Sequence, residues 1–297
     1  MNEVYDQFLT TKLKEAFLLS ENDKRVKTSF WPTDAEKNVF DLYHEWIGTP
    51  KTNPIEPEKL IMFNAAKMIE VALVNKFAYM GLLQQENGVF EKILKKLGLA
   101  KPKQTRIEME REGVKITGYM DAVFVDGTPL EVKTFYGDYQ AKELKLGKPK
   151  TAYLKQLAMY MDFQNADKGK LLYMDRGVGE IYEFTLTREG TKFKCMSIEF
   201  DITDTYKRFA RLYNNNIVPQ IEPKSEYRYK YPLGDIVNAS KGDISAARTN
   251  KAVYGDWQVK YSPYKDLIIE REGCGLGYSD EEITKIKELT KGYSSKY

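Results

Sequence analysis

The stretch GYMDAVFVDGTPLEVKT, residues Gly118–Thr134, has the pattern of two short β-strands joined by a turn. Its centre, Asp126–Pro129, has the composition of a tight turn, and the flanking residues are those that strands favour. Three charged residues nevertheless lie inside the strands: Asp121, Glu131 and Lys133. Because the strands are expected to form a hairpin, we expect Asp121 on the first strand to lie beside Glu131 on the second.

The alternation of side chains along the second strand gives its charged residues a common face. Glu131 and Lys133 share one face, while Leu130 and Val132 share the other. Two neighbouring carboxylates repel each other unless a cation joins them, and Mg²⁺ or Mn²⁺ accepts such oxygen ligands, with the main-chain carbonyl of Val132 as a further one. The stretch therefore predicts a metal site for phosphodiester hydrolysis, with Asp121 and Glu131 as ligands. The alternative is an exposed strand with an ordinary salt bridge.

The composition indicates a soluble, globular chain. Of its 297 residues, 42% are hydrophobic and 30% are charged. No apolar run approaches the ~18 residues of a membrane span, and the polar N-terminus does not resemble a signal peptide, so no membrane is expected as a partner. Cys195 and Cys274 show no pairing pattern, which favours a reducing, cytoplasmic location.

Histidine is nearly absent from the chain. The only one, His44, is expected on the surface of a helix rather than as a ligand. The near absence of histidine is taken to exclude Ser-His-Asp and Cys-His catalysis, and it excludes a multi-histidine metal site. Any chemistry must therefore depend on carboxylates, lysine, tyrosine or serine.

Hydrophobic periodicity predicts an α+β fold with an α/β-type core, in which a mixed central sheet is flanked by helices. Helices are expected over 4–19, from a cap at Thr33 or Asp34 to Gly48, from Pro57 to Met80, and over 89–97, 150–163, 202–214 and 279–292. Strands are expected over 105–110, 115–125, 129–134, 169–175 and 180–187. We expect a single domain over 1–297, with a helical arm (1–98), a catalytic core (100–190) and an irregular C-terminal segment (200–297) that packs back on the arm.

A second pair of residues adds to the charged hairpin. Gln156 and Tyr160 are four residues apart in the helix expected over 150–163, so they share a face. With them, the sequence resembles the PD-(D/E)XK nuclease superfamily, specifically its RecB-like exonuclease branch, which carries Gly-x-x-Asp, Glu-x-Lys and Gln-x-x-x-Tyr in this order. The matching residues are Gly118, Asp121, Glu131, Lys133, Gln156 and Tyr160. The resemblance implies a restriction-endonuclease-like fold.

The resemblance also implies a role for each matching residue. Asp121 and Glu131 would hold Mg²⁺ or Mn²⁺. Lys133 would activate water or stabilise the pentavalent phosphate. Gln156 and Tyr160 would position Lys133 or the DNA backbone.

An upstream helix of that branch carries a further metal ligand, often a histidine. The matching stretch is AAKMIEVALVNKF, residues 65–77, in which Glu70 falls at the histidine position. Its helical neighbours are partly apolar, and a carboxylate on such a face requires a partner. Glu70 is therefore a candidate metal ligand. The alternative is a surface glutamate beside Lys67.

A lysine-rich stretch, AKELKLGKPKTAYLK, separates the charged hairpin from the Gln156 helix. As a loop over 142–155 it would follow the phosphates of DNA, and nearby tyrosines would stack on bases. The alternative is a solvated loop without a partner. The candidate DNA-binding residues are Lys142, Lys145, Lys148, Lys150, Lys155, Tyr136, Tyr139 and Tyr153.

One subgroup of the branch, which includes CRISPR-associated and bacterial recombination nucleases, holds an iron–sulfur cluster on four cysteines. The matching frames here are WPTDAEKNVFDLYH and WQVKYSPYKDLI, but other residues occupy the cysteine positions: Asn38, Val259, Ser262 and Ile268. None of them ligates iron as a thiolate does, so no iron–sulfur cluster is expected. The resemblance implies that the arm and the C-terminal segment still meet, through burial of Trp257, Tyr261 and Tyr264.

Together these features predict a Mg²⁺- or Mn²⁺-dependent DNA nuclease. An exonuclease that acts on DNA ends or single strands, in repair, recombination or the processing of phage or mobile-element DNA, is the preferred interpretation. One alternative is a nucleic-acid-binding recombination partner that keeps the fold but cleaves weakly or not at all. Another is a sequence-specific endonuclease, which the lack of an obvious target-recognition domain disfavours.

Overall fold

The computed structural model describes residues 27–84, 105–226, 259 and 261–272, together with 11, 12, 14–16, 281, 284 and 288. The helix expected over 89–97 lies outside the described residues. Most residues of the helices expected over 4–19 and 279–292 also lie outside them. The chain divides into two compact units. Unit 1 comprises Met1–Lys37 and Glu56–Gln220, and unit 2 comprises Asn38–Ile55 and Ile221–Tyr297. The expected single domain over 1–297 stays a prediction.

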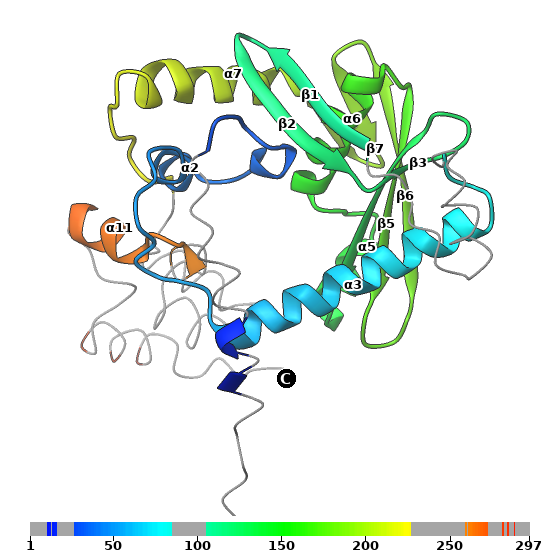
Figure 1. The fold of residues 1–297 in the computed structure, drawn as a ribbon, viewed down its shortest axis with the longest axis horizontal. Helices are drawn as coiled ribbons and strands as arrows, with labels where there is room; N and C mark the ends of the chain where they lie inside the picture. The colour runs from blue at the N-terminus through cyan, green and yellow to red at the C-terminus, as the bar shows by residue number, and fades with distance from the viewer. Residues whose placement is uncertain are drawn as a thin grey trace, which may run out of the picture. The chain divides into compact units, whose positions relative to one another are not determined.

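Unit 1 is built on a mixed sheet. Within the described residues, six strands form it in the order β3-β4-β5-β6-β7-β8, and only β4 and β5 pair in parallel (Figure 1). The strands are β3 (Ala122–Val123), β4 (Pro129–Phe135), β5 (Lys168–Asp175), β6 (Ile181–Glu189), β7 (Lys192–Cys195) and β8 (Ile198–Asp201). A separate antiparallel pair consists of β1 (Thr105–Arg111) and β2 (Val114–Met120). The predicted strands are confirmed, but the one expected over 115–125 is interrupted at Asp121, and β7 and β8 were not predicted.

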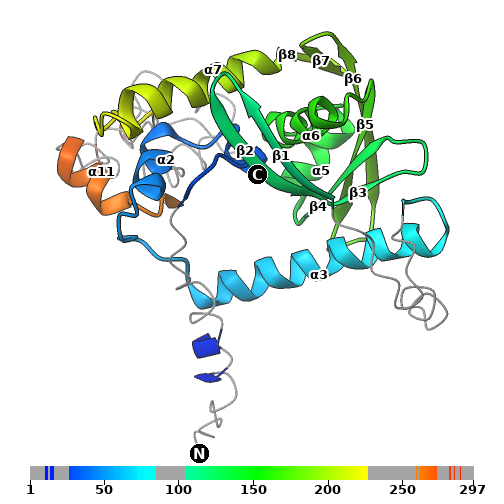
Figure 2. The ribbon, with the colours of Figure 1, turned by 45° about the horizontal axis from the view of Figure 1, so that its top comes forward.

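Helices cover both faces of this sheet. Figure 2 shows α3 (Pro57–Tyr79) and α6 (Thr151–Gln164) on opposite sides of β4. Two further helices are α5 (Asp138–Lys145), which ends inside the expected basic loop, and α7 (Ile202–Leu212), which continues as a π-helical turn. The predicted α+β architecture, a mixed sheet flanked by helices, is confirmed. None of the helices in the described part of the chain has the length and apolar character needed to span a bilayer.

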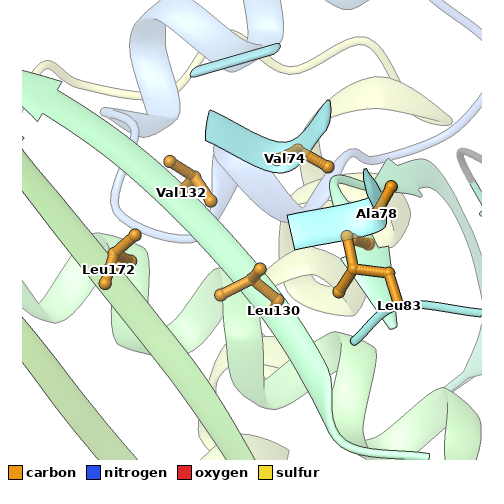
Figure 3. Close-up of a cluster of buried hydrophobic side chains, with 7 residues drawn as sticks. Val74, Ala78, Leu83, Leu130, Val132 and Leu172 are labelled. Atoms are coloured by element: carbon orange, nitrogen blue, oxygen red, sulfur yellow. The ribbon is translucent and has the colours of Figure 1, made fainter. Parts of the chain in front are cut away.

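The core between α3 and the sheet explains the position of β4. Leu130 and Val132 pack with Val74 and Ala78 of α3 and with Leu172 of β5 (Figure 3). Because neighbouring side chains of a strand alternate, the residues between and after these two project to the other face of the sheet. Burial of Leu130 and Val132 against α3 therefore directs Glu131 and Lys133 to the opposite face of the sheet.

The predicted hairpin is formed by β3 and β4. In its turn, Asp126 Oδ1 accepts the Thr128 N–H at 3.0 Å, and Gly127 has a φ of 88°, a conformation that glycine adopts without steric cost. Ala122 faces Leu130 in the antiparallel register.

The segment that precedes α3 in unit 1 packs on β2. Phe30 exchanges backbone hydrogen bonds with the strand, and a Cβ atom at Gly118 would come within 2.8 Å of the Pro32 ring. Asp34 is buried, forms an ion pair with Lys27 at 2.6 Å and accepts the Trp31 N–H at 2.8 Å. Pro32–Asp34 forms a 3₁₀ turn and the next helix begins only at Val39, so the prediction that one helix runs from Thr33 or Asp34 to Gly48 was wrong at its start.

Unit 2 brings the arm and the C-terminal segment together. Its helix α2 (Val39–Trp46) begins at the N-cap Asn38, and α11 (Lys265–Glu272) lies in the segment expected to be irregular. Phe40 packs with Val259, Tyr264 and Ile268 in one buried cluster. In this cluster a residue of the arm contacts residues of the C-terminal segment. The relation to the iron–sulfur subgroup and the absence of a cluster stay predictions.

Two expectations for unit 2 were wrong. Tyr261 is 53% exposed, so its expected burial was wrong, whereas Tyr264 is buried. His44 is buried rather than on a helix surface; its ring hydrogen-bonds with Thr49 at 2.9 Å and with Glu222 at 3.2 Å. Trp257 lies outside the described residues.

Candidate active site

The β3–β4 hairpin positions the first two predicted site residues. Ala122 pairs with Leu130, so continuing the register places Asp121 opposite Glu131, where the strand that holds Asp121 is interrupted. The Val132 N–H donates to Asp121 Oδ2 at 3.0 Å. A main-chain donor of β4 thus fixes the first carboxylate beside the second, as the sequence predicted.

Glu131 is a buried carboxylate with little compensation. Its side chain is 1% exposed, and no hydrogen bond of normal geometry reaches either oxygen. The Lys133 ammonium contacts Oε1 as an ion pair. Burial, with the nearby charge of Asp121, raises the pKa of Glu131 to about 8. An additional cation near Glu131 would therefore stabilise its ionised form.

Lys133 is held on the same face of β4. Its ammonium lies 5.1 Å from the ring centroid of Tyr153 on α6, a cation–π contact. Burial alone would lower the pKa of Lys133, but the charges of Glu131 and Asp121 outweigh burial and raise it. The site therefore holds a fixed positive charge beside its carboxylates.

Glu70 reaches the same site from α3. The Thr134 N–H of β4 donates to its Oε1 at 3.2 Å, and its side chain is only 12% exposed. The Lys67 ammonium lies 3.4 Å from Glu70 Oε2 and 3.4 Å from Asp121 Oδ1. The structure thus brings Glu70 together with the hairpin carboxylates, and it adds Lys67, to which the sequence reasoning gave no role.

Gln156 and Tyr160 are buried on α6 and support the strand that leads to Asp121. The Gln156 amide donates to the Tyr160 hydroxyl at 2.8 Å, and that hydroxyl donates to the carbonyl of Tyr119 at 3.0 Å. Burial raises the pKa of Tyr160, so its proton is retained for this bond. These contacts anchor the end of β2 and so position Asp121. They differ from the expected contacts with Lys133 or the DNA backbone.

The lysine-rich segment forms α5, a turn and the start of α6 rather than one loop. Its exposed lysines are Lys142, Lys145, Lys148 and Lys150. Two of the predicted lysines already pair with carboxylates, Lys145 with Glu180 at 3.1 Å and Lys155 with Glu36.

The nearby tyrosines have two different environments. Tyr136 and Tyr139 are 74% and 78% exposed, which leaves their rings accessible to a base. Tyr153 is partly buried, and its ring lies beside the ammonium groups of Lys133 and Lys150. It is placed to support Lys133 rather than to stack.

The side chains that meet at β4 carry carboxylate oxygens, the ligand type that hard divalent cations take. Three carboxylates meet at β4: Glu70 from α3, Asp121 from the residue before β3, and the buried Glu131 of β4 itself. Over the residues that the structure describes, no group of three His, Cys, Asp or Glu side chains is arranged to hold a metal ion. The ammonium groups of Lys67 and Lys133 lie among the carboxylates. The residues that would hold an ion are Glu70, Asp121, Glu131 and the carbonyl of Val132.

Comparisons with known proteins give a limited result. No protein-family model matches the chain, and no curated protein matches it. Among solved structures, the chain is similar to SSO0001 at 15% identity, with a TM-score of 0.49 and coverage of 92% of this chain and 100% of that one. It is similar to LHK-Exo in complex with dAMP at 15% identity, with a TM-score of 0.39 and coverage of 71% and 94%.

A second structure of LHK-Exo, an alkaline exonuclease from Laribacter hongkongensis, gives 15% identity, a TM-score of 0.29 and coverage of 70% and 94%. At this identity and these scores, the likenesses do not decide what the chain does. The geometry around β4 is the stronger guide.

Proposed function

We propose that the chain is a divalent-metal-dependent DNA nuclease, with its active site at Glu70, Asp121, Glu131 and Lys133. The single observation that supports this most strongly is the Glu131 carboxylate, which is fully buried beside the Asp121 carboxylate and forms an ion pair with Lys133. A fold does not retain such an arrangement for stability alone, because burying a carboxylate beside another one costs free energy whether the group is ionised or takes up a proton.

The side chains of the site have separate tasks in this proposal. Bound Mg²⁺ or Mn²⁺ would neutralise the carboxylates and stabilise the negative charge that develops on the phosphodiester. The backbone N–H groups of Val132 and Thr134 hold the carboxylates of Asp121 and Glu70 in place. Lys133, fixed by Glu131 and the Tyr153 ring, presents a positive charge to the pentavalent phosphate.

The surface next to the site supports DNA as the substrate. Lysines that reach solvent lie on α5 and on the turn before α6, next in the chain after β4, and they suit a phosphate backbone. Tyr136 and Tyr139 offer exposed rings for stacking on unpaired bases. This combination favours DNA ends or single strands, and hence exonuclease action.

The test is cleavage of 5′- and 3′-labelled single-stranded and double-stranded DNA in Mg²⁺, Mn²⁺ or EDTA. We expect metal-dependent release of short products from the wild-type protein. Asp121→Asn should abolish this release, and Asp204→Asn, which removes an exposed carboxylate from α7, should not. Binding of DNA without cleavage in either metal would favour the non-cleaving recombination partner. Fixed-length internal fragments would favour the endonuclease.

A further inference from the structure

Lys67 occupies the gap between two carboxylates that the proposed function assigns to a metal ion. It is one turn before Glu70 on α3, and its ammonium lies 3.4 Å from one oxygen of Glu70 and 3.4 Å from one oxygen of Asp121. Each distance is at the long end for an ion pair. The ammonium is therefore shared between two carboxylates and held tightly by neither.

The two lysines of the site differ in their freedom to move. The Lys67 side chain is 52% exposed, whereas that of Lys133 is 17% exposed and lies against the Tyr153 ring. A flexible lysine stem that is half in solvent loses little packing when its head group rotates outward. Glu70 and Asp121 would keep their positions without Lys67, because backbone N–H groups of β4 hold their other oxygens.

We propose that Lys67 is a built-in competitor for the divalent ion, which occupies the Glu70–Asp121 gap in the metal-free protein and leaves it when the ion binds. This inference rests on the proposed metal-dependent function and adds to it a residue that sets the metal affinity. A divalent ion must displace one ammonium ion, and this displacement weakens the apparent binding of the metal. The lysine in turn keeps two neighbouring carboxylates from repelling each other in the metal-free protein.

Binding of Mn²⁺ without DNA tests this directly, by isothermal titration calorimetry or by the electron paramagnetic resonance signal of free Mn²⁺. Lys67→Met removes the charge and keeps the length of the side chain. It should lower the dissociation constant for Mn²⁺ roughly 2- to 30-fold, the range that two exposed ion pairs cover. Lys67→Arg, which keeps the charge, should bind Mn²⁺ like the wild type. Lys76→Met, which removes a lysine from the same helix that lies over Tyr79, is the matched control.

The possible outcomes separate this inference from the proposed function. Tighter binding in Lys67→Met alone supports the competitor role. Unchanged or weaker binding in Lys67→Met overturns it while leaving the metal site intact, and so does equal tightening in Lys76→Met, which would show a general charge effect. If neither the wild type nor any variant binds Mn²⁺, the metal-dependent function itself fails and this inference fails with it.

Discussion

Two buried carboxylates, one in each unit, have opposite environments. Glu131 in unit 1 is 1% exposed and Asp41 in unit 2 is 3% exposed. Asp41 accepts a hydrogen bond of 2.7 Å from the Ser262 hydroxyl, whereas Glu131 contacts the Lys133 ammonium as an ion pair and lies beside the Asp121 carboxylate. Since burial is equal, the difference lies in the partners. A buried carboxylate held by a neutral hydroxyl donor supports the fold, whereas one that lies beside a second carboxylate and pairs with a lysine suits a site for a cation.

The most direct test of this difference is to neutralise Glu131 and Asp41 in separate variants. Glu131→Gln keeps the size of the side chain but holds a divalent ion poorly, so we expect the cleavage rate to fall roughly 10²–10³-fold, the scale of losing one preorganised transition-state contact. Asp41→Asn should keep the cleavage rate and lower the melting temperature instead. Cleavage kinetics and thermal unfolding of both variants provide the check. Near-normal cleavage by Glu131→Gln would remove it from the site.

The partner of Glu131 gives the next largest effect. Lys133→Met retains a long apolar stem against the Tyr153 ring but loses the positive charge, so the rate should fall about 10²-fold while DNA binding is kept. Lys192→Met, which removes an exposed lysine from the same sheet, is the control. Single-turnover cleavage and a DNA-binding titration distinguish the two effects. If Lys133→Met unfolds the protein yet the folded fraction still cleaves normally, the lysine is structural.

In unit 2 the corresponding change affects stability alone. Ser262→Ala removes the hydroxyl that donates to Asp41 and that accepts the Tyr264 N–H at 3.1 Å. Loss of a donor from a buried carboxylate costs roughly 1–3 kcal/mol, so the melting temperature should fall with no change in cleavage rate. Ser197→Ala, at an exposed serine, should leave both unchanged. A loss of activity in Ser262→Ala at full folding would contradict the division of roles.

The sequence predicted the parts of the fold that strong local patterns specify. The long helix from Pro57, the hairpin around Asp126–Pro129 and the common face of Glu131 and Lys133 follow from capping, turn chemistry and the two-residue period of a strand. The short strands β7 and β8 are four residues each. They were missed because four residues give too little alternation to separate a strand from a loop.

The rest of the site depends on contacts that are distant in sequence. Asp34 has the sequence signal of a helix cap, but Lys27 and the Trp31 N–H already use its carboxylate, so the cap is Asn38. Lys67 had only a helical spacing of three residues from Glu70 to indicate it, and its contact with Asp121 spans 54 residues. Such pairs cannot be read from a local pattern.

The smallest expected effects are on how the stability of the folded protein depends on pH, and they have opposite signs for His44 and Glu131. Burial, together with the charge of Arg271, lowers the pKa of His44 in unit 2 to about 4, against 6.5 in the unfolded chain. Between these pH values His44 is protonated in the unfolded chain but not in the folded chain. The free energy of unfolding therefore decreases as the pH falls from 6.5 towards 4. Glu131 has the opposite sign. Its pKa is raised from 4.5 to about 8, so the folded chain retains a proton that the unfolded chain releases, and stability is lost as the pH rises between these values.

Both signs can be measured on one protein in EDTA. His44 is the only histidine, so its ring protons give an unambiguous NMR titration, and we expect a midpoint far below 6.5. Unfolding across pH 4.5 to 8 should show that Glu131→Gln removes a loss of stability with rising pH that the wild type has, because the glutamine cannot release a proton. A His44 midpoint near 6.5 would show that its ring is not sequestered as described. An identical pH dependence in Glu131→Gln and the wild type would show that the carboxylate is already ionised and satisfied in the folded protein, and the contrast with Asp41 would then be lost.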